Sequence, residues 1–195
     1  MYKRKEVERL TGNEEFLNTG NNKISVRDFW QYAYSNLNSN VTRGALAEFL
    51  LEASLKDLNE IKIRNPWGDY DVEHLDKTIE VKCCAYIQDW DQDKLTKIQW
   101  TGLKATELFW NNAVATRTTE KKKDYKAQYY ILALLDHQET ETLNILDLNQ
   151  WKFFVLTKNE LKSISNDGIS VSLVKIQKSG IRPVLFSELK DKLSA

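Results

Sequence analysis

The sequence predicts an α/β or α+β fold in which helices flank a mixed central β-sheet, and three observations lead to this prediction. Helical spacing of apolar residues dominates the front of the chain, up to about residue 58. Strand patterns dominate the middle and the back, and the apolar run 127–137 is typical of a central strand. Because we find no internal repeat, linker or low-complexity tract, we expect residues 1–195 to form a single domain.

The first helices are predicted from charge, capping and periodicity. Residues 1–22 carry charge, Asn and Gly, and there we expect only a short helix near Lys5–Leu10. Ser25 and Asp28 have the S-x-x-D form of a capping box, which begins a helix that the polar segment 35–40 ends. This capped helix is the first well-marked element of the chain.

A second helix is predicted from about Thr42 to Leu58. Apolar residues occur nearly all round it, which indicates a largely buried helix. Glu48 and Glu52 are the exceptions, one turn apart. A carboxylate among so many apolar side chains is costly to ionise unless something pairs with it. For Glu48 one such partner is a local cation, such as Arg43 or a lysine.

A β-hairpin is predicted at residues 70–84, and the functional argument depends on it. Its second half, TIEVKCC, alternates as a half-buried strand does, so Glu80 and Lys82 share one face. The preceding stretch is polar enough to turn, and we expect Leu75 and Asp76 at the tip. Two short strands joined by a tight turn are therefore expected here.

This hairpin brings carboxylates together. Asp71 would lie directly across from Glu80, with Cβ atoms about 5 Å apart. Like charges so placed destabilise a sheet, so the pair needs a counter-charge. A divalent cation supplies one; the alternative is a purely structural core in which Lys82 and Arg43 neutralise both carboxylates. Asp69 lies on the same face and is a rival for the role of Asp71, which we prefer because it pairs with Glu80 and precedes an apolar residue.

The rest of the chain is predicted mainly from short apolar runs and caps. We expect strands at 98–103, 127–137, 143–148 and 151–155, a short helix capped at Thr157 with Glu160 three residues on, a strand from Ile169 through ISVSLVKI, and a terminal helix over SELKDKLS.

An Asp followed by Glu-x-Lys on the next strand resembles the active-site pattern of the PD-(D/E)XK nuclease superfamily. The matching residues are Asp71, Glu80 and Lys82, and Tyr70 stands where the pattern's name has proline. A helix with the sequence RGALAEF precedes the hairpin and AYIQDW follows it, as in small bacterial members. The resemblance covers Ser25 to Trp100 and extends to the rest of the chain only in general layout.

The resemblance implies a restriction-endonuclease-like core and a Mg²⁺-dependent endonuclease that hydrolyses DNA, of restriction or defence type, with Mn²⁺ as a substitute metal. Asp71 and Glu80 would be direct ligands, with the carbonyl of Val81 as a third. Glu48 would bind the metal or its water. Lys82 would orient or activate the attacking water and offset charge on the phosphate. The alternative is a nucleic-acid-binding module of the same fold that does not cleave, or a nuclease subunit that needs a partner chain.

Candidate substrate contacts lie outside the hairpin. Gln88 follows the catalytic strand, where a substrate backbone would approach, and Arg43 lies in the helical motif. Lys121, Lys122 and Lys123 belong to the one clear basic run, and such lysines neutralise phosphates without recognising sequence. We expect a nucleic-acid partner, DNA rather than RNA, and the superfamily's need to cut two strands is compatible with a homodimer.

Composition limits the remaining functions. The 28 basic residues equal the 28 acidic ones, so nucleic acid must be held by local patches. No 18 consecutive apolar residues occur and the N-terminus lacks an apolar signal-peptide core, so we expect a cytoplasmic protein with no membrane partner. The 42% apolar content is typical of an ordered globular chain.

Cysteine and histidine patterns argue against other chemistries. Cys83 and Cys84 are adjacent in one strand, so their side chains leave on opposite faces and a mutual disulfide is not expected. His74 and His137 have neither a nucleophile partner motif nor metal-site spacing. Without GxGxxG or a P-loop, the sequence gives no indication of a nucleotide cofactor.

Overall fold

The computed structural model describes residues 2, 5–66, 68–106, 110–111, 114–115 and 123–194. It divides into two compact units, Met1–Leu37 and Asn38–Ala195. The second unit contains a four-stranded sheet and the helices that cover it. The single-domain organisation of residues 1–195 stays a prediction.

The N-terminal unit contains helix α1 (Val26–Tyr34), which begins at the predicted capping box. The Ser25 hydroxyl accepts a hydrogen bond from the Asp28 amide at 3.3 Å, and the Asp28 carboxylate accepts one from the Ser25 amide at 2.7 Å. The prediction of a short helix near Lys5–Leu10 is wrong, since residues 5–10 are not helical. Only Val7 and Leu10 are apolar there and both are exposed, so the segment has no apolar face whose burial would stabilise so short a helix.

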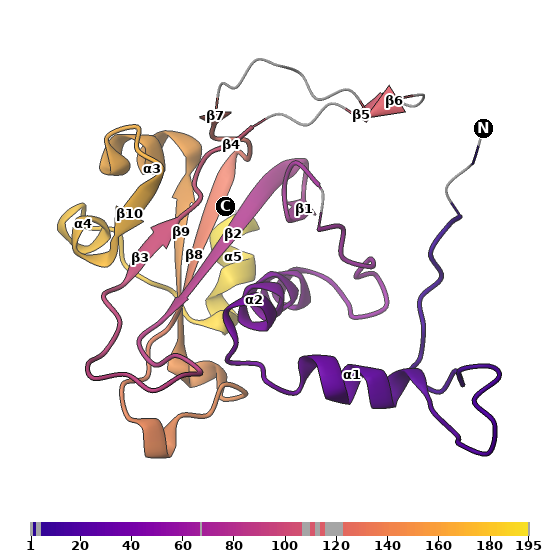
Figure 1. Ribbon diagram of the computed structural model, residues 1–195. Coiled ribbons are helices and arrows are strands. Elements are labelled where there is room, and N and C mark those ends of the chain that lie inside the picture. The colour runs from indigo at the N-terminus through magenta and orange to yellow at the C-terminus, as the bar shows by residue number, and fades with distance from the viewer. Residues whose placement is uncertain are drawn as a thin grey trace. The chain divides into compact units, whose positions relative to one another are not determined.

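The second unit is built on a sheet of strand order β1-β2-β8-β9 (Figure 1). The outer pairs, β1 with β2 and β8 with β9, are antiparallel, and the central pair, β2 with β8, is parallel. The predicted mixed central sheet is confirmed. Its strands are β1 (Val72–His74), β2 (Lys77–Ala85), β8 (Tyr129–Leu135) and β9 (Trp151–Thr157).

Both faces of this sheet are covered, which explains why β8 is a continuous apolar run. Every residue from Tyr130 to Leu135 is buried. One core cluster includes buried residues of the sheet and of helices α2 (Asn40–Leu55) and α5 (Leu189–Ser194). The other joins the opposite face of the sheet to β3 (Gln99–Thr101), β10 (Ser170–Ser172), α3 (Lys158–Ser165) and α4 (Leu173–Lys178).

Helix α2 is shorter and more exposed than the sequence predicts. It begins at Asn40, after a cap in which the Ser39 hydroxyl accepts from the Thr42 amide at 3.3 Å, and it ends at Leu55. Only one side is buried, and Phe49 on another side is 46% exposed. The expectation of a largely buried helix was wrong because α2 packs against the sheet with a single face.

Side-chain caps determine where helices begin in the C-terminal part of the chain. Helix α3 begins at the predicted box, in which the Thr157 hydroxyl accepts from the Glu160 amide. The strand predicted through ISVSLVKI is right only for β10, because the Ser172 hydroxyl accepts from the Lys175 amide and begins α4 at Leu173. The terminal helix is confirmed as α5.

The strand expected at 143–148 is wrong. The Asn144 side chain accepts from the Leu146 amide, and Asp147 accepts from the Asn149 amide, so side chains turn the backbone here. The described residues also include β4 (Ala105–Thr106), β5 (Trp110–Asn111), β6 (Val114–Ala115), β7 (Lys123–Asp124), and the 3₁₀ turns η1 (Thr140–Thr142), η2 (Leu148–Gln150) and η3 (Phe186–Glu188).

None of the helices in the described part of the chain has the length and apolar character needed to cross a membrane.

Candidate functional site

The hairpin has the predicted register and turn. His74 pairs with Lys77, so Leu75 and Asp76 form a two-residue loop. Both loop residues have positive φ, 48° and 60°, as a type I′ turn requires. The ladder continues to the pair Val72 and Ile79. The next residue toward the N-terminus, Asp71, is thereby brought to the level of Glu80.

Asp71 is anchored to β2 through both its backbone and its side chain. Its amide donates to the carbonyl of Ile79 at 3.0 Å. Its carboxylate accepts a hydrogen bond from the amide of Val81 at 2.8 Å. Asp71 is partly buried, whereas its rival Asp69 is exposed, and these contacts favour Asp71 as the residue that acts with Glu80.

The pKa of Asp71 is raised to about 7. Burial is the largest cause, and the negative charges of Glu80 and then Glu48 add to it. The Val81 amide and the Lys82 ammonium lower the pKa and offset only part of this effect. Glu80 on β2 and Glu48 on α2 therefore lie close enough to Asp71, just before β1, to disfavour its negative charge, and an added cation would relieve that effect.

Lys82 lies two residues beyond Glu80 on the same face of β2, and its ammonium forms an ion pair with the Glu80 carboxylate. The two side chains are 26% and 19% exposed. The predicted face-sharing of Glu80 and Lys82 is confirmed, and both groups are reachable from solvent.

Glu48 pairs with a residue that the sequence reasoning missed. Arg64, in the loop between α2 and β1, places Nη2 2.6 Å from Glu48 Oε1, and its Nε pairs with Oε2. The predicted local partner, Arg43 or a lysine, is not the one found. Sixteen residues of chain separate Glu48 from Arg64, and no periodic pattern links a loop residue to a helix across that distance.

The donor set of the candidate site has the chemistry that a hard cation prefers, three carboxylates without thiolate or imidazole. Among the described residues, however, no group of three His, Cys, Asp or Glu side chains is placed to hold a metal ion. The carboxylates point to other partners: Glu48 to Arg64, Glu80 to Lys82, and Asp71 to the Val81 amide. Cation binding thus requires side-chain rotation away from these partners. A role for the Val81 carbonyl as a ligand stays a prediction.

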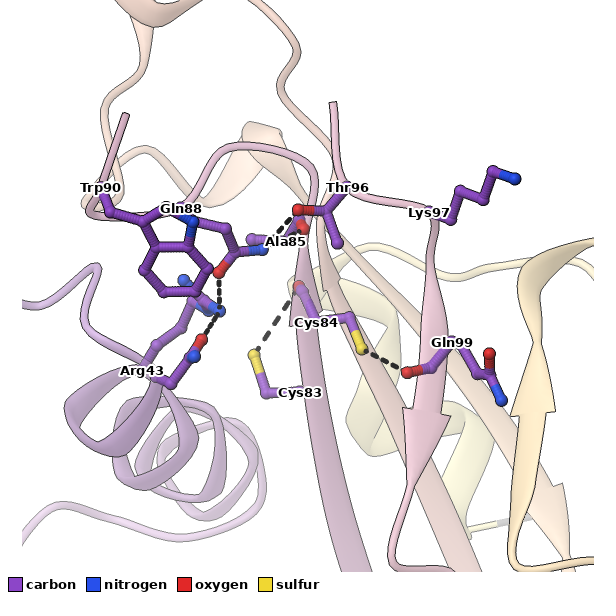
Figure 2. Close-up of a pocket in the computed structure, with 10 residues that line it drawn as sticks. Arg43, Cys83, Cys84, Ala85, Gln88, Trp90, Thr96, Lys97 and Gln99 are labelled. Atoms are coloured by element: carbon purple, nitrogen blue, oxygen red, sulfur yellow. Dashed lines mark hydrogen bonds between the residues drawn. The ribbon is translucent and has the colours of Figure 1, made fainter. Parts of the chain in front are cut away.

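Arg43 and Gln88, both predicted to contact substrate, contact each other (Figure 2), and their contact with substrate stays a prediction. Arg43 is 3% exposed. Its Nη1 donates to the carbonyl and the side-chain oxygen of Asn38 at 2.6 and 3.0 Å. Its Nη2 donates to the side chains of Asn40 and Gln88 at 2.5 and 3.0 Å. Nη1 and Nη2 thus donate inside the protein, whereas the buried Nε has no hydrogen-bond partner among the described residues.

Gln88 is held as firmly as Arg43. Its side-chain nitrogen donates to the Ala85 carbonyl at 2.8 Å and to the Thr96 hydroxyl at 3.1 Å. Its backbone amide donates to the Gln92 side chain at 2.7 Å. The network borders a pocket of ≈ 210 Å³ lined by Asn40, Arg43, Cys83, Cys84, Ala85, Gln88, Trp90, Thr96, Lys97 and Gln99.

The two cysteines line this pocket as free thiols. Burial raises the pKa of Cys83 to about 12 and that of Cys84 to about 11, so both are protonated at neutral pH. Figure 2 shows the two sulfur atoms on different sides of β2. The prediction that they do not form a mutual disulfide is confirmed.

The basic run lies mostly outside the described residues. Lys121 and Lys122 are among those not described, and Lys123 is exposed at the start of β7. Their contact with nucleic acid stays a prediction.

Comparison of the chain with protein-family models, with curated proteins and with solved structures gives no match.

Proposed function

We propose that this chain is a metal-dependent nuclease that hydrolyses phosphodiester bonds of DNA, with a restriction-endonuclease-like core. The observation that supports this most directly is the electrostatic coupling of Asp71 to both Glu80 and Glu48. A carboxyl whose pKa is raised by burial and by two neighbouring carboxylates, in a partly exposed position, is more typical of a functional site than of a structural core.

Each group has a role that follows from its position. Asp71, Glu80 and Glu48 would hold a divalent cation, and Asp71, whose pKa is about 7, would bind it as the carboxylate. A cation held there would supply charge stabilisation at a phosphoryl oxygen and a site for the attacking water. Lys82, once released from Glu80, donates from Nζ to a phosphate oxygen or to the attacking water. The Val81 amide keeps the Asp71 carboxylate oriented.

The test is cleavage of plasmid DNA by the purified protein with Mg²⁺ or Mn²⁺. The variant Glu80→Ala with Lys82→Ala is expected to lose cleavage by about a hundredfold or more, because it removes a ligand and the only cation on that face of the hairpin strand. The matched control is Glu141→Ala with Lys178→Ala, which removes the same two charges from exposed positions outside the hairpin. Equal cleavage by wild type and by the hairpin variant would refute the proposal.

A second candidate function is a nucleic-acid-binding module that does not cleave, or a nuclease subunit that needs a partner chain. Two observations favour it: the described residues contain no ready-made three-group metal site, and the whole chain has no net charge. Calorimetric titration with Mn²⁺ separates the two functions. No uptake at millimolar Mn²⁺ would favour the non-cleaving module.

A further inference from the structure

Arg64 holds Glu48 with two donors from the solvent side. Nη2 lies 2.6 Å from Oε1 and Nε pairs with Oε2, so both carboxylate oxygens are engaged. The Arg64 side chain is 49% exposed and that of Glu48 only 14%. A half-exposed guanidinium thus occupies both oxygens of a mostly buried carboxylate.

The five charged side chains of the candidate site balance differently with and without a divalent cation. Three carboxylates, Glu48, Asp71 and Glu80, face two cations, Arg64 and Lys82. When all are ionised, one negative charge remains, which would repel a phosphodiester. A divalent cation changes this to one positive charge, equal and opposite to the charge of one phosphodiester.

Arg64 engages both oxygens of Glu48, so a cation that binds this carboxylate competes with the guanidinium for its negative charge. A cation that binds on the side where Arg64 lies displaces at least one arm of the Arg64 pair. The displaced guanidinium is a planar fork that fits two oxygens of a phosphate as well as it fits a carboxylate. Its exposure allows it to reach a ligand without a change in the core.

We propose that Arg64 exchanges partners: Glu48 holds it while no cation is bound, and it binds a phosphate of the nucleic acid once a cation takes Glu48. This inference rests on the proposed function, since it assigns a substrate contact at the same site. Arg64 then competes with the cation for Glu48 and cooperates with the cation in phosphate binding. These two effects have opposite signs, which a purely structural ion pair would not produce.

The first measurement is calorimetric titration of Mn²⁺ into wild type, Arg64→Gln and Lys62→Gln. Loss of the competing guanidinium is expected to tighten Mn²⁺ binding by Arg64→Gln about threefold to tenfold. Lys62 is exposed in the same loop, and its replacement removes the same unit charge. Because a solvated charge is screened by salt, Lys62→Gln should match wild type within about twofold.

The second measurement is anisotropy of a labelled DNA duplex with phosphorothioate linkages, which slow cleavage, in EDTA and in Mn²⁺. Wild type should gain about tenfold in DNA affinity when Mn²⁺ replaces EDTA, and Arg64→Gln about twofold or less. Arg64→Lys keeps the positive charge without the planar guanidinium, so its gain in DNA affinity should lie between those of wild type and Arg64→Gln. Thermal unfolding of each variant verifies that it is folded.

The outcomes separate the two proposals. No Mn²⁺ uptake by wild type would overturn the proposed function and this inference together. Uptake by wild type, with Arg64→Gln unchanged in both measurements or weakened in both, would overturn the role of Arg64 alone. Tighter Mn²⁺ binding combined with a lost Mn²⁺-dependent gain in DNA affinity supports the exchange.

Discussion

Two clusters of charged residues lie beside helix α2 and strand β2, one around Arg43 and one around Asp71. The two clusters are built in opposite ways. At one cluster, Arg43 is buried and donates to four oxygen acceptors, among them the side chain of Gln88. At the other, burial raises the pKa of Asp71, and the like charges of Glu80 and Glu48 raise it further. The first cluster pairs its charge with oxygen acceptors, and the second keeps a carboxyl whose ionisation is disfavoured.

This difference separates a structural use of charge from a functional one. A buried guanidinium surrounded by acceptors orients the loops that supply those acceptors, and removing it leaves them unpaired. Carboxylates held together against their repulsion lower stability in the absence of a ligand. Sites that are locally costly in this way are where binding or catalysis is expected. Substitution should therefore destabilise the first cluster and stabilise the second.

The largest expected effect is at Arg43. Arg43→Met should lower the free energy of unfolding by about 3 kcal/mol, because it removes the donor to the buried Gln88 side chain and the donors to the part-buried contacts with Asn38 and Asn40. Urea denaturation at pH 7 measures this change. Arg64→Gln is the comparison, and it should cost less than about 1 kcal/mol because that pair is half exposed on the arginine side. Equal losses at the two arginines would remove the distinction between the clusters.

The next effect has the opposite sign and depends on pH. The folded pKa of Asp71 is raised to about 7, above its usual value of 3.8, so the carboxyl costs no stability below about pH 4. As the pH rises toward and through 7, the folded protein loses stability relative to the unfolded chain. Asp71→Asn cannot ionise and keeps an oxygen that accepts from the Val81 amide. It should be about 2 kcal/mol more stable than wild type at pH 8.

Urea denaturation in EDTA at pH 4.5, 6 and 8 checks this, and the advantage of Asp71→Asn should shrink as the pH falls. Adding Mn²⁺ at pH 8 should raise the stability of wild type by more than that of the variant, because the cation binds the folded carboxylate. A variant that is less stable than wild type at pH 8 would place Asp71 with the structural residues.

The hairpin shows how much the sequence could predict. Alternation in TIEVKCC and a polar tip were enough to predict the register, the turn and the shared face of Glu80 and Lys82. Each of these depends on residues close in the chain, where the period of a strand decides which side chains meet. The capping boxes at Ser25 and Thr157 were predicted for the same reason.

What the sequence could not predict depends on contacts between distant segments. Arg64 is one charged residue in a loop, and only the packing of that loop beside α2 makes it the partner of Glu48. Arg43 and Gln88 have residue types suited to phosphate, and only the folded chain shows that Nη1 and Nη2 of Arg43 and the side-chain nitrogen of Gln88 donate inside the protein. Residue type predicts what a side chain can bind, while tertiary structure decides whether it is available.

The smallest expected effect is at Asp69, which tests whether the repulsion is specific to one of two neighbouring carboxylates. Asp69 is exposed, so Asp69→Asn should change the free energy of unfolding by less than about 0.5 kcal/mol. The dependence of stability on pH should remain that of wild type, because the buried carboxylate is still present. The same urea series at three pH values provides the measurement. If Asp69→Asn abolished the loss of stability between pH 4.5 and 8 and Asp71→Asn did not, Asp69 would be the first ligand. The comparison with Arg43 would then apply to Asp69 and not to Asp71.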